Sequence, residues 1–206
     1  MKVLITGVTG FIGSNLARRL ILDNKKVEAI IRPESNTNIL NDIKEKVKFH
    51  IHDGTSENMF KILKKSKPDI VCHLASISNY NHDLKDIEPM FKSNILFGTQ
   101  LVDSMVKNNI YNFINTGTYW QHYESKEYNP SCLYAATKKA FEDIVKYYNE
   151  VDKLKVITLK LFDNYGPNDT RNKLFDFLGN AIANNQKIKM SKGEQLINIV
   201  YISDII

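Results

Sequence analysis

Short apolar runs alternate with segments of helical periodicity over most of this chain. Apolar runs rich in β-branched residues predict buried strands, and apolar residues that recur every three or four positions predict amphipathic helices. Their alternation is typical of parallel strands joined by right-handed crossovers. Strands are predicted over residues 2–6, 27–31, 47–51, 69–74, 112–115 and 155–161, and helices over 11–22, 57–65, 87–107 and 134–149.

The alternation becomes irregular after Pro167. One helix is predicted over residues 174–183, followed by short strands over 187–190 and 198–202. Residues 167–206 are therefore interpreted as the start of a smaller, substrate-side lobe that contains a returning strand.

The composition is that of an ordinary globular protein, with 206 residues, 43% hydrophobic and 25% charged. No apolar run is long enough to span a bilayer. The net charge is +5, but the lysines are scattered, which indicates solvated helix faces rather than a nucleic-acid surface. Two isolated cysteines, Cys72 and Cys132, suit a reducing cytoplasm and suggest neither a disulfide framework nor a metal site.

Three glycines, Gly7, Gly10 and Gly13, lie between the first predicted strand and the first helix. Such a loop lets the backbone turn tightly, approach a pyrophosphate and bring helix against strand. The helix N-terminus then offers its N–H groups and the positive end of its dipole to the phosphates. This context predicts a dinucleotide site rather than an ordinary turn. By analogy with dinucleotide-binding folds, we expect a doubly wound parallel sheet of order 3-2-1-4-5-6.

Tyr134 and Lys138 spell Y-x-x-x-K within a predicted helix, so the two side chains share one helix face. A free tyrosine has a pKa near 10 and is a poor base at neutral pH. The lysine ammonium, together with an oxidised nicotinamide, would favour the phenolate. Tyr134 could then exchange a proton with a sugar hydroxyl as hydride moves at the carbon. Such pairs are common on solvated helices, and the glycine loop upstream favours the functional interpretation.

The glycine loop G-V-T-G-F-I-G with Y-x-x-x-K downstream resembles the short-chain dehydrogenase/reductase superfamily, in particular its extended branch of nucleotide-sugar epimerases, dehydratases and reductases. Further matches follow in family order: H-L-A at 73–75, Asn94 within the helical segment 93–99, L-F-D-N-Y-G-P at 161–167 and the segment 198–206. The resemblance implies an α/β, Rossmann-type NAD(P)-binding domain over 1–166 and a substrate lobe that starts at 167. The family continues past this last segment, so we expect the lobe to be truncated.

The resemblance implies a catalytic set of Thr118, Tyr134 and Lys138. Aligning His122 and the residue after it with the family's Y-G motif places Thr118 at the catalytic Ser/Thr, and Thr116 is the alternative. Lys138 would also hold the nicotinamide ribose. The cofactor-binding residues implied are Gly7, Thr9, Gly10, Phe11, Ile12, Gly13, Arg32, Asp53, Gly54, Leu74, Ala75, Ser76, Asn94, Tyr134, Lys138 and Phe162.

Arg32 stands where an NAD-binding fold places a carboxylate, at the end of the second strand. An arginine there can clamp a 2′-phosphate, so NADP is favoured over NAD. The alternative is a surface arginine, with Glu34 binding the ribose. Asp53 resembles the family aspartate beside the adenine, and from spacing alone it is equally a turn residue.

Dehydration is disfavoured, because family dehydratases carry Asp and Glu where Tyr119 and Trp120 follow the threonine here. Substrate contacts are expected from Ser78, Trp120 and Asn164, while His122 lines the pocket or packs at its rim. Segments 118–123 and 161–167 look most similar to 4-keto-deoxyhexose reductases such as CDP-abequose or CDP-paratose synthases.

We therefore expect a cytoplasmic NAD(P)-dependent nucleotide-sugar oxidoreductase, foremost an NADPH-dependent reductase of a 4-keto-deoxyhexose nucleotide in surface-polysaccharide sugar synthesis. An NAD-dependent 4-epimerase is one alternative, and a non-catalytic dinucleotide-binding module or inactive fragment is another. The expected partner is the nucleotide-sugar, with neither nucleic acid nor membrane. Family dimers pair through the long helices, here 87–107 and 134–149, although the core explains apolar helix faces equally well.

Overall fold

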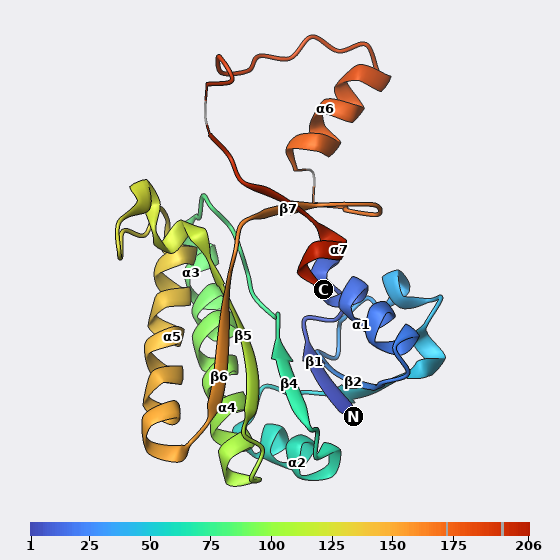
Figure 1. Cartoon of the computed structure of the whole chain (residues 1–206), viewed down its shortest axis with the longest axis vertical. Coiled ribbons are helices and arrows are strands. Elements are labelled where there is room, and N and C mark those ends of the chain that lie inside the picture. The colour runs from blue at the N-terminus through green and yellow to red at the C-terminus, as the bar shows by residue number, and fades with distance from the viewer. Residues whose placement is uncertain (172, 195) are drawn as a thin grey trace. The chain divides into compact units, whose positions relative to one another are not determined.

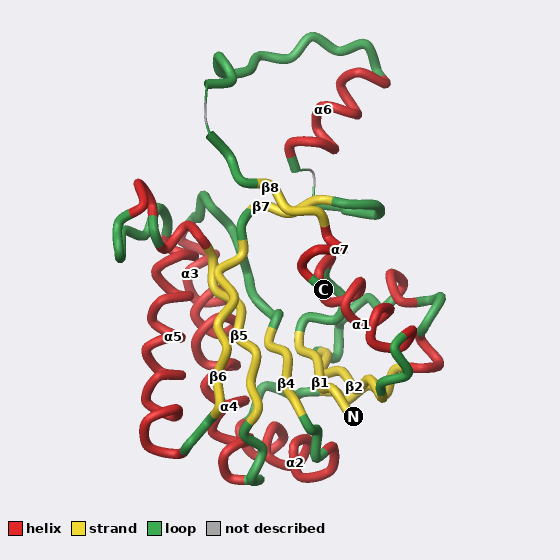
Figure 2. The backbone as a smooth tube through the Cα atoms, in the orientation of Figure 1, coloured by secondary structure: helices red, strands yellow, loops and turns green. Residues whose placement is uncertain are grey.

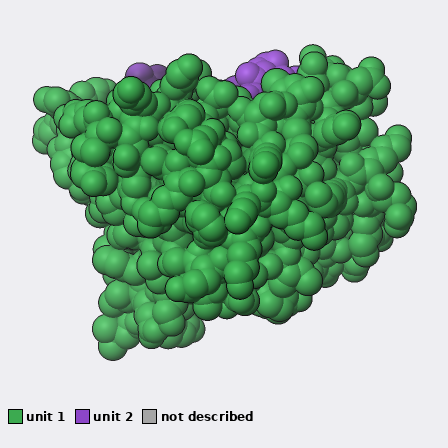
Figure 3. Space-filling model, turned by 90° about the horizontal axis from the view of Figure 1, so that it is seen from below, with its two compact units in different colours: residues 1–161 green, residues 162–206 purple. Residues whose placement is uncertain are grey.

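The computed structural model describes residues 1–171, 173–194 and 196–206. The chain forms two compact units, Met1–Leu161 and Phe162–Ile206, which carry different colours in Figure 3. The assignment of a cofactor domain and a substrate lobe stays a prediction, because the units are defined by packing alone. None of the described helices is both long and apolar enough to cross a membrane.

A six-stranded sheet forms the centre of the first unit (Figure 2). Its order β3-β2-β1-β4-β5-β6 confirms the order expected from the sequence, and its neighbouring strands are parallel. The α/β fold class is likewise confirmed. The strands are β1 (Lys2–Thr6), β2 (Lys26–Ile31), β3 (Val47–Ile51), β4 (Ile70–His73), β5 (Asn112–Thr118) and β6 (Lys155–Leu161).

Side chains that alternate along the strands enter two separate cores, because successive residues of a strand point to opposite faces of the sheet. Leu4 and Val71 belong to the core under α2 (Ser56–Ser66), α4 (Phe97–Lys107) and α5 (Leu133–Asp152), whereas Val3 and Ile5 belong to the core under α1 (Phe11–Leu22). Figure 1 labels these four helices. The crossovers change faces between β1 and β4, the place where open α/β sheets bind ligands at the strand ends. The helices are α1 (Phe11–Leu22), η1 (Asn38–Leu40), η2 (Lys44–Lys46), α2 (Ser56–Ser66), α3 (Leu84–Phe91), η3 (Lys92–Leu96), α4 (Phe97–Lys107), η4 (Tyr119–Gln121), η5 (Tyr123–Ser125) and α5 (Leu133–Asp152).

The helix predicted over residues 87–107 is interrupted by one π-helical turn, η3. Single π turns inside α-helices often occur at functional sites. Here the turn contains Asn94, whose amide oxygen accepts from the Ile77 backbone N–H at 2.8 Å and whose nitrogen donates to the Ile77 carbonyl at 2.9 Å. A periodicity of apolar residues carries no information about such a bond, so the sequence predicted one continuous helix.

The second unit is built around two short parallel strands, β7 (Asp163–Tyr165) and β8 (Ile199–Tyr201), with helices α6 (Leu174–Ala183) and α7 (Ile202–Ile205). The α6 prediction is confirmed to the residue. The strand predicted over 187–190 is wrong, since those residues have no regular structure and β8 pairs with β7 instead. The returning strand was expected over 198–202, but α7 already begins at Ile202.

Candidate active site

The glycine loop connects β1 to α1 and is too tight for side chains. Gly7 has φ +75°, and a Cβ on it would lie 2.6 Å from the Ala75 backbone nitrogen. A Cβ on Gly13 would lie 2.2 Å from the Gly7 carbonyl oxygen. Gly10 is the N-cap of α1 and offers no side chain there. This cradle fits a dinucleotide pyrophosphate at a helix N-terminus, with Thr9, Phe11 and Ile12 completing the loop and first turn.

The loop is held against the end of β4 by Thr6. Its Oγ1 accepts from the backbone N–H groups of Leu74 and Ala75, both at 3.2 Å, and lies 2.8 Å from Nδ1 of His73. Burial lowers the pKa of His73 to about 3, so this imidazole is neutral. The segment H-L-A therefore fixes the position of the cradle, and Leu74 and Ala75 lie beside it.

The side chain of Asn94 holds the loop that follows β4. Besides the Ile77 backbone, its amide bonds the Ser76 hydroxyl at 3.2 Å and Thr137 Oγ1 of α5 at 3.0 Å. The side chain is 1% exposed. Because protein groups meet both the donors and the acceptor of this amide, Asn94 positions the Ser76 loop against α5. Direct cofactor contact by Asn94 stays a prediction.

Tyr134 lies near the start of α5 and is 9% exposed, with its hydroxyl hydrogen-bonded to the Ser76 side chain. Burial raises the pKa of Tyr134 to about 12, and the bond to Ser76 opposes this only in part. From the sequence we expected Lys138, together with an oxidised nicotinamide, to lower the pKa of Tyr134. In the protein by itself, desolvation of the phenolate outweighs any help from the lysine one turn away.

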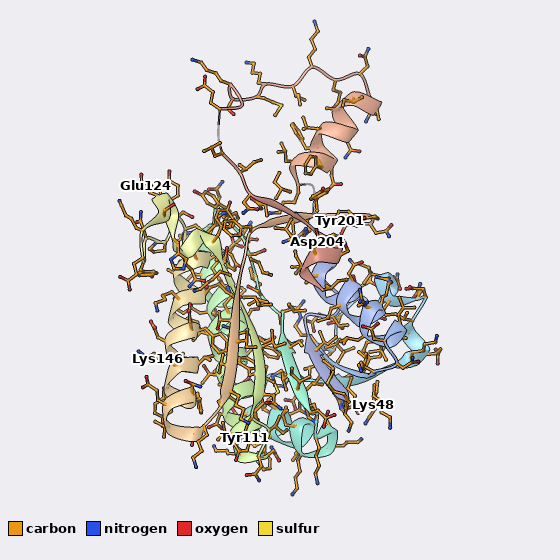
Figure 4. The ribbon with its side chains drawn as sticks, viewed as in Figure 1. Lys48, Tyr111, Glu124, Lys146, Tyr201 and Asp204 are labelled. Atoms are coloured by element: carbon orange, nitrogen blue, oxygen red, sulfur yellow. The ribbon has the colours of Figure 1, made fainter. Side chains whose placement is uncertain are left out.

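Lys138 is 2% exposed, so both members of the Y-x-x-x-K pair point inward rather than onto a solvated helix face. Figure 4 shows Lys146 on the outer side of the same helix for comparison. Burial lowers the pKa of Lys138 to about 8, repulsion from Lys160 acts in the same direction, and attraction by Glu142 opposes both. A buried lysine with so low a pKa is typical of functional sites.

Thr118 ends β5 and is 6% exposed. Its Oγ1 accepts from the Trp120 backbone N–H at 3.3 Å, and the Trp120 ring packs perpendicular to Tyr134 with centroids 5.9 Å apart. Thr116 donates its hydroxyl to the His73 carbonyl at 3.0 Å, which joins β5 to β4. The hydroxyl of Thr116 is therefore used in a bond between two strands, whereas Thr118 lies at the turn whose Trp120 ring packs on Tyr134.

Trp120 is the centre of an aromatic cluster, with the Tyr80 ring at 5.1 Å and the Tyr119 ring at 5.8 Å. His122 lines a separate cavity of about 520 Å³ with Lys126, Glu127, Tyr128, Lys139, Glu142 and Lys160. Ser78 is exposed on the loop after β4. Trp120 therefore lies against Tyr134, whereas the substrate roles of Trp120 and Ser78 stay predictions.

Two of the predicted adenosine-side residues lie at the ends of neighbouring strands. Arg32 follows β2, with Nε 3.2 Å from the Glu34 carboxylate, and its side chain is 70% exposed. Asp53 follows β3 and accepts from the Thr55 N–H at 2.9 Å and hydroxyl at 2.7 Å, while Gly54 has φ +94°. Asp53 is therefore a turn residue in this structure, and its adenine contact stays a prediction.

Phe162 and Asn164 belong to the second unit. Phe162 is 40% exposed. Asn164 lies in β7 and is 8% exposed, and its side-chain oxygen accepts from Arg171 at 2.8 Å. Arg171 in turn pairs with Asp169. The roles of Phe162 and Asn164 in binding stay predictions.

A family model described as "NAD dependent epimerase/dehydratase family" matches residues 3–206, nearly the whole chain. The chain belongs to this family. A family member, the CDP-abequose synthase of Yersinia pseudotuberculosis, is 32% identical over 210 residues that cover 100% of this chain and 71% of the relative. The dTDP-D-glucose 4,6-dehydratase of Dictyostelium discoideum is 29% identical, with 54% of its length covered.

Solved structures of the family agree on the fold. The UDP-glucose 4-epimerase of Thermotoga maritima superposes with a TM-score of 0.88 at 22% identity, over 100% of this chain and 71% of that one. The UDP-glucuronic acid 4-epimerase of Bacillus cereus in complex with NAD gives a TM-score of 0.84 at 26% identity, again over 100% and 71%. The resemblance inferred from the motifs is therefore confirmed at the level of the family.

Some residues of this site escaped the sequence interpretation. Gln121 is 0% exposed and bonds both the end of β5 and Glu142 of α5, and Tyr80 contacts Trp120. The spacing T-x-x-Q of Thr118 and Gln121 is typical of a capping box, so the sequence could have predicted the bond between these two residues. For Tyr80 the sequence offered no signal, because its contact crosses between distant loops.

Proposed function

We propose that this protein reduces the 4-keto group of a deoxyhexose nucleotide with NADPH. The observation that carries the proposal is the packing of Trp120 against a buried Tyr134, where family dehydratases carry an acidic pair. An indole cannot act as the acid or base that removes water, and Tyr134 remains as the group that would donate a proton to a ketone. The CDP-abequose synthase relative supports a CDP-linked deoxysugar as substrate.

The protonation states suit reduction. With a pKa of about 12, Tyr134 is a phenol at neutral pH and can donate its proton to the oxygen of a bound ketone. Thr118, at the end of β5, would hold the same oxygen through its hydroxyl. Lys138, with a pKa of about 8, is mostly charged at pH 7 and stabilises the phenolate left after proton transfer. Solvent then returns the proton to Tyr134.

The glycine cradle fits the cofactor, because a Cβ on Gly7 or Gly13 would collide with backbone atoms of the loop and of the segment after β4 and so prevent this tight turn before α1. Gly7, Gly10 and Gly13 would hold the pyrophosphate, Lys138 the nicotinamide ribose and Arg32 the 2′-phosphate. When bound, the reduced nicotinamide supplies the hydride that reaches the carbonyl carbon. Tyr134 would donate the proton to the carbonyl oxygen, so that this proton and the hydride together account for reduction of the ketone to an alcohol, with NADPH oxidised to NADP⁺.

The test is to mix the protein with NADPH and a CDP-4-keto-6-deoxyhexose and to follow the loss of reduced-nicotinamide absorbance. Tyr134→Phe should lower kcat by about 10²–10⁴-fold while NADPH affinity, measured by calorimetry, is retained. Lys139→Met is the matched control, since Lys139 neighbours Lys138 in sequence but pairs with Asp143 on the exposed side of α5. Equal turnover by wild type and Tyr134→Phe would contradict the proposal.

An NAD-dependent 4-epimerase is the second candidate. It is favoured by the Arg32–Glu34 ion pair, because a carboxylate at this strand end can bind ribose hydroxyls and repel a 2′-phosphate. The solved relatives that are 4-epimerases also support it. The two functions differ in cofactor, so cofactor preference separates them.

The proposed partners are the nucleotide-sugar and a second copy of the chain, and the proposed location is the cytoplasm. Exposed apolar side chains on the helical side of the first unit support the dimer. They are Leu84, Ile87, Phe91 and Leu96 along α3 and η3, and Tyr147 and Val151 on α5.

A further inference from the structure

Gln121 is a fully buried amide at the third position of the turn that follows Thr118. Its Oε1 accepts from the Thr118 backbone N–H at 2.9 Å, and its Nε2 donates to Oε2 of Glu142 at 2.9 Å. The partners define the orientation of this amide, since the reversed orientation would face donor with donor and acceptor with acceptor. Gln121 therefore joins the end of β5 to α5.

Glu142 is the second anchor of this connection. It lies one helical turn after Lys138 and also accepts from the ammonium of Lys160 on β6. Burial acts to raise the pKa of Glu142, but the hydrogen bonds from Lys160 and Gln121 outweigh it and leave the pKa below its usual range. Glu142 is thus an ionised carboxylate, which accepts hydrogen bonds more strongly than a neutral group.

The residues around the Gln121–Glu142 hydrogen bond are closely packed and leave little room for the side chains to move. Gly117 and Lys160 are paired in the β5–β6 register, and a Cβ on Gly117 would lie 2.8 Å from Cδ of Lys160 and 2.9 Å from Oε1 of Gln121. On the other side, the backbone carbonyls of Gln121 and Trp120 accept from the N–H groups of Asn129 at 2.9 Å and Ser131 at 3.0 Å. The turn that carries Thr118 and Trp120 is therefore fixed from both sides.

We propose that Gln121 and Glu142 are positioning residues that set Thr118 and Trp120 relative to Tyr134 and Lys138. Thr118 comes from the end of a strand and Tyr134 from a helix, so their relative placement depends on a bond between those two elements. The Gln121–Glu142 hydrogen bond is such a bond. Misplacement of a catalytic group by about 1 Å can cost on the order of 100-fold in rate. This inference rests on the proposed reductase function for its kinetic readout only.

The test is a reciprocal exchange. Gln121→Glu sets two carboxylates against each other, and Glu142→Gln sets two amides together and leaves Lys160 without its carboxylate. Each single variant should lower kcat about 10–100-fold with little change in KM. Combining Gln121→Glu with Glu142→Gln restores one carboxylate and one amide, so it should recover most of the lost kcat. Asp143→Asn is the matched control, since Asp143 neighbours Glu142 but is 60% exposed and pairs with Lys139 on the outer side of α5.

Hydrogen exchange at the Thr118 amide tests the same bond without any substrate. The amide should exchange faster in both single variants, and its protection should return in the double variant. Unchanged kcat and unchanged amide protection in the single variants would overturn the positioning role. A loss of kcat that the double variant does not recover, with the Thr118 amide still protected, would also overturn it.

The two proposals fail differently. If wild type reduces no 4-keto sugar nucleotide, the reductase assignment fails, while amide protection at Thr118 still decides the positioning role. If one single variant does not fold, the other single variant and the double variant carry the comparison.

Discussion

The indole ring of Trp120 stands at 90° to the phenol ring of Tyr134, with centroids 5.9 Å apart. The edge-to-face arrangement is the favoured geometry for aromatic pairs. The indole covers part of the Tyr134 phenol, and burial is the main cause of the raised pKa of Tyr134. Trp120, which stands at one of the two positions where family dehydratases carry a carboxylate, therefore also helps to keep Tyr134 protonated.

Trp120→Ala should lower the pKa of Tyr134 from about 12 toward its ordinary value near 10, because the phenolate becomes hydrated. NMR titration of protein labelled at the tyrosine ring Cζ measures this pKa, with Tyr134→Phe identifying the signal. Tyr80→Ala is the control, since Tyr80 contacts Trp120 and is already 48% exposed. An unchanged Tyr134 pKa in Trp120→Ala would show that the indole does not cause the shift.

The sheet and the glycine loop were predictable because both are local in sequence. Strand and helix periods are repeated over several residues, and three glycines at fixed spacing report a tight turn directly. The order of the strands was taken from the analogy with dinucleotide-binding folds, and the structure confirms it. The prediction failed at 187–190, where a short run resembled a strand but had no neighbouring strand with which to pair.

The chemistry of the site was less predictable, because burial and cross-element bonds are tertiary properties. Y-x-x-x-K placed Tyr134 and Lys138 on one face, but it could not show that burial raises the pKa of Tyr134 in the protein without cofactor, because burial depends on the rings and loops around the phenol. The π turn at Asn94 depends on a bond to Ile77, and the role of Gln121 depends on a glutamate in another helix.

If two copies of the chain pair through α5, two charged residues introduced on that helix should dissociate the dimer. Tyr147 is 56% exposed and Val151, one turn later, is 60% exposed. Tyr147→Lys combined with Val151→Glu places charges that must be desolvated in a helix-to-helix interface, which costs several kcal/mol per buried charge. Wild type should sediment as a dimer and this variant as a monomer. Ile157→Lys, at a 61% exposed site on β6, is the control and should stay dimeric. A monomeric wild type would contradict the dimer.

The buried ammonium of Lys138 should lower the free energy of unfolding of the wild-type protein at neutral pH. Its folded-state pKa of about 8 lies below the ordinary value of 10.5, so below pH 8 the folded protein carries a buried charge that the unfolded chain hydrates. Between pH 8 and 10.5 the unfolded chain keeps this proton while the folded protein has lost it, so stability rises with pH across that window. The shift corresponds to a penalty on the order of 3 kcal/mol at pH 7.

Lys138→Met should therefore raise the free energy of unfolding by up to about that amount at pH 7 while abolishing turnover. The gain over wild type should shrink as pH rises through 8 and vanish near 10.5. Urea unfolding at several pH values measures it. Lys146→Met is the control, because Lys146 is 70% exposed and should contribute no such penalty. A destabilised Lys138→Met at pH 7 would mean that packing around the ammonium outweighs its desolvation.

Cofactor preference depends on which member of the Arg32–Glu34 pair faces the adenosine ribose. If Arg32 binds a 2′-phosphate, Arg32→Ala should weaken NADPH binding by about 10–100-fold, as expected for a charge-assisted hydrogen bond, and should barely change NADH binding. Glu34→Gln should then strengthen NADPH binding by no more than about five-fold, since an exposed ion pair is worth up to about 1 kcal/mol.

Calorimetric titration of both cofactors into wild type, Arg32→Ala and Glu34→Gln distinguishes the two assignments. Arg19→Ala is the control, because Arg19 is an exposed arginine in the last turn of α1 that pairs with Asp23. Suppose instead that wild type prefers NADH and that Glu34→Gln weakens NADH binding. Glu34 would then hold the ribose hydroxyls, Arg32 would not select the cofactor, and the NAD-dependent epimerase would replace the NADPH-dependent reductase as the better account of this site.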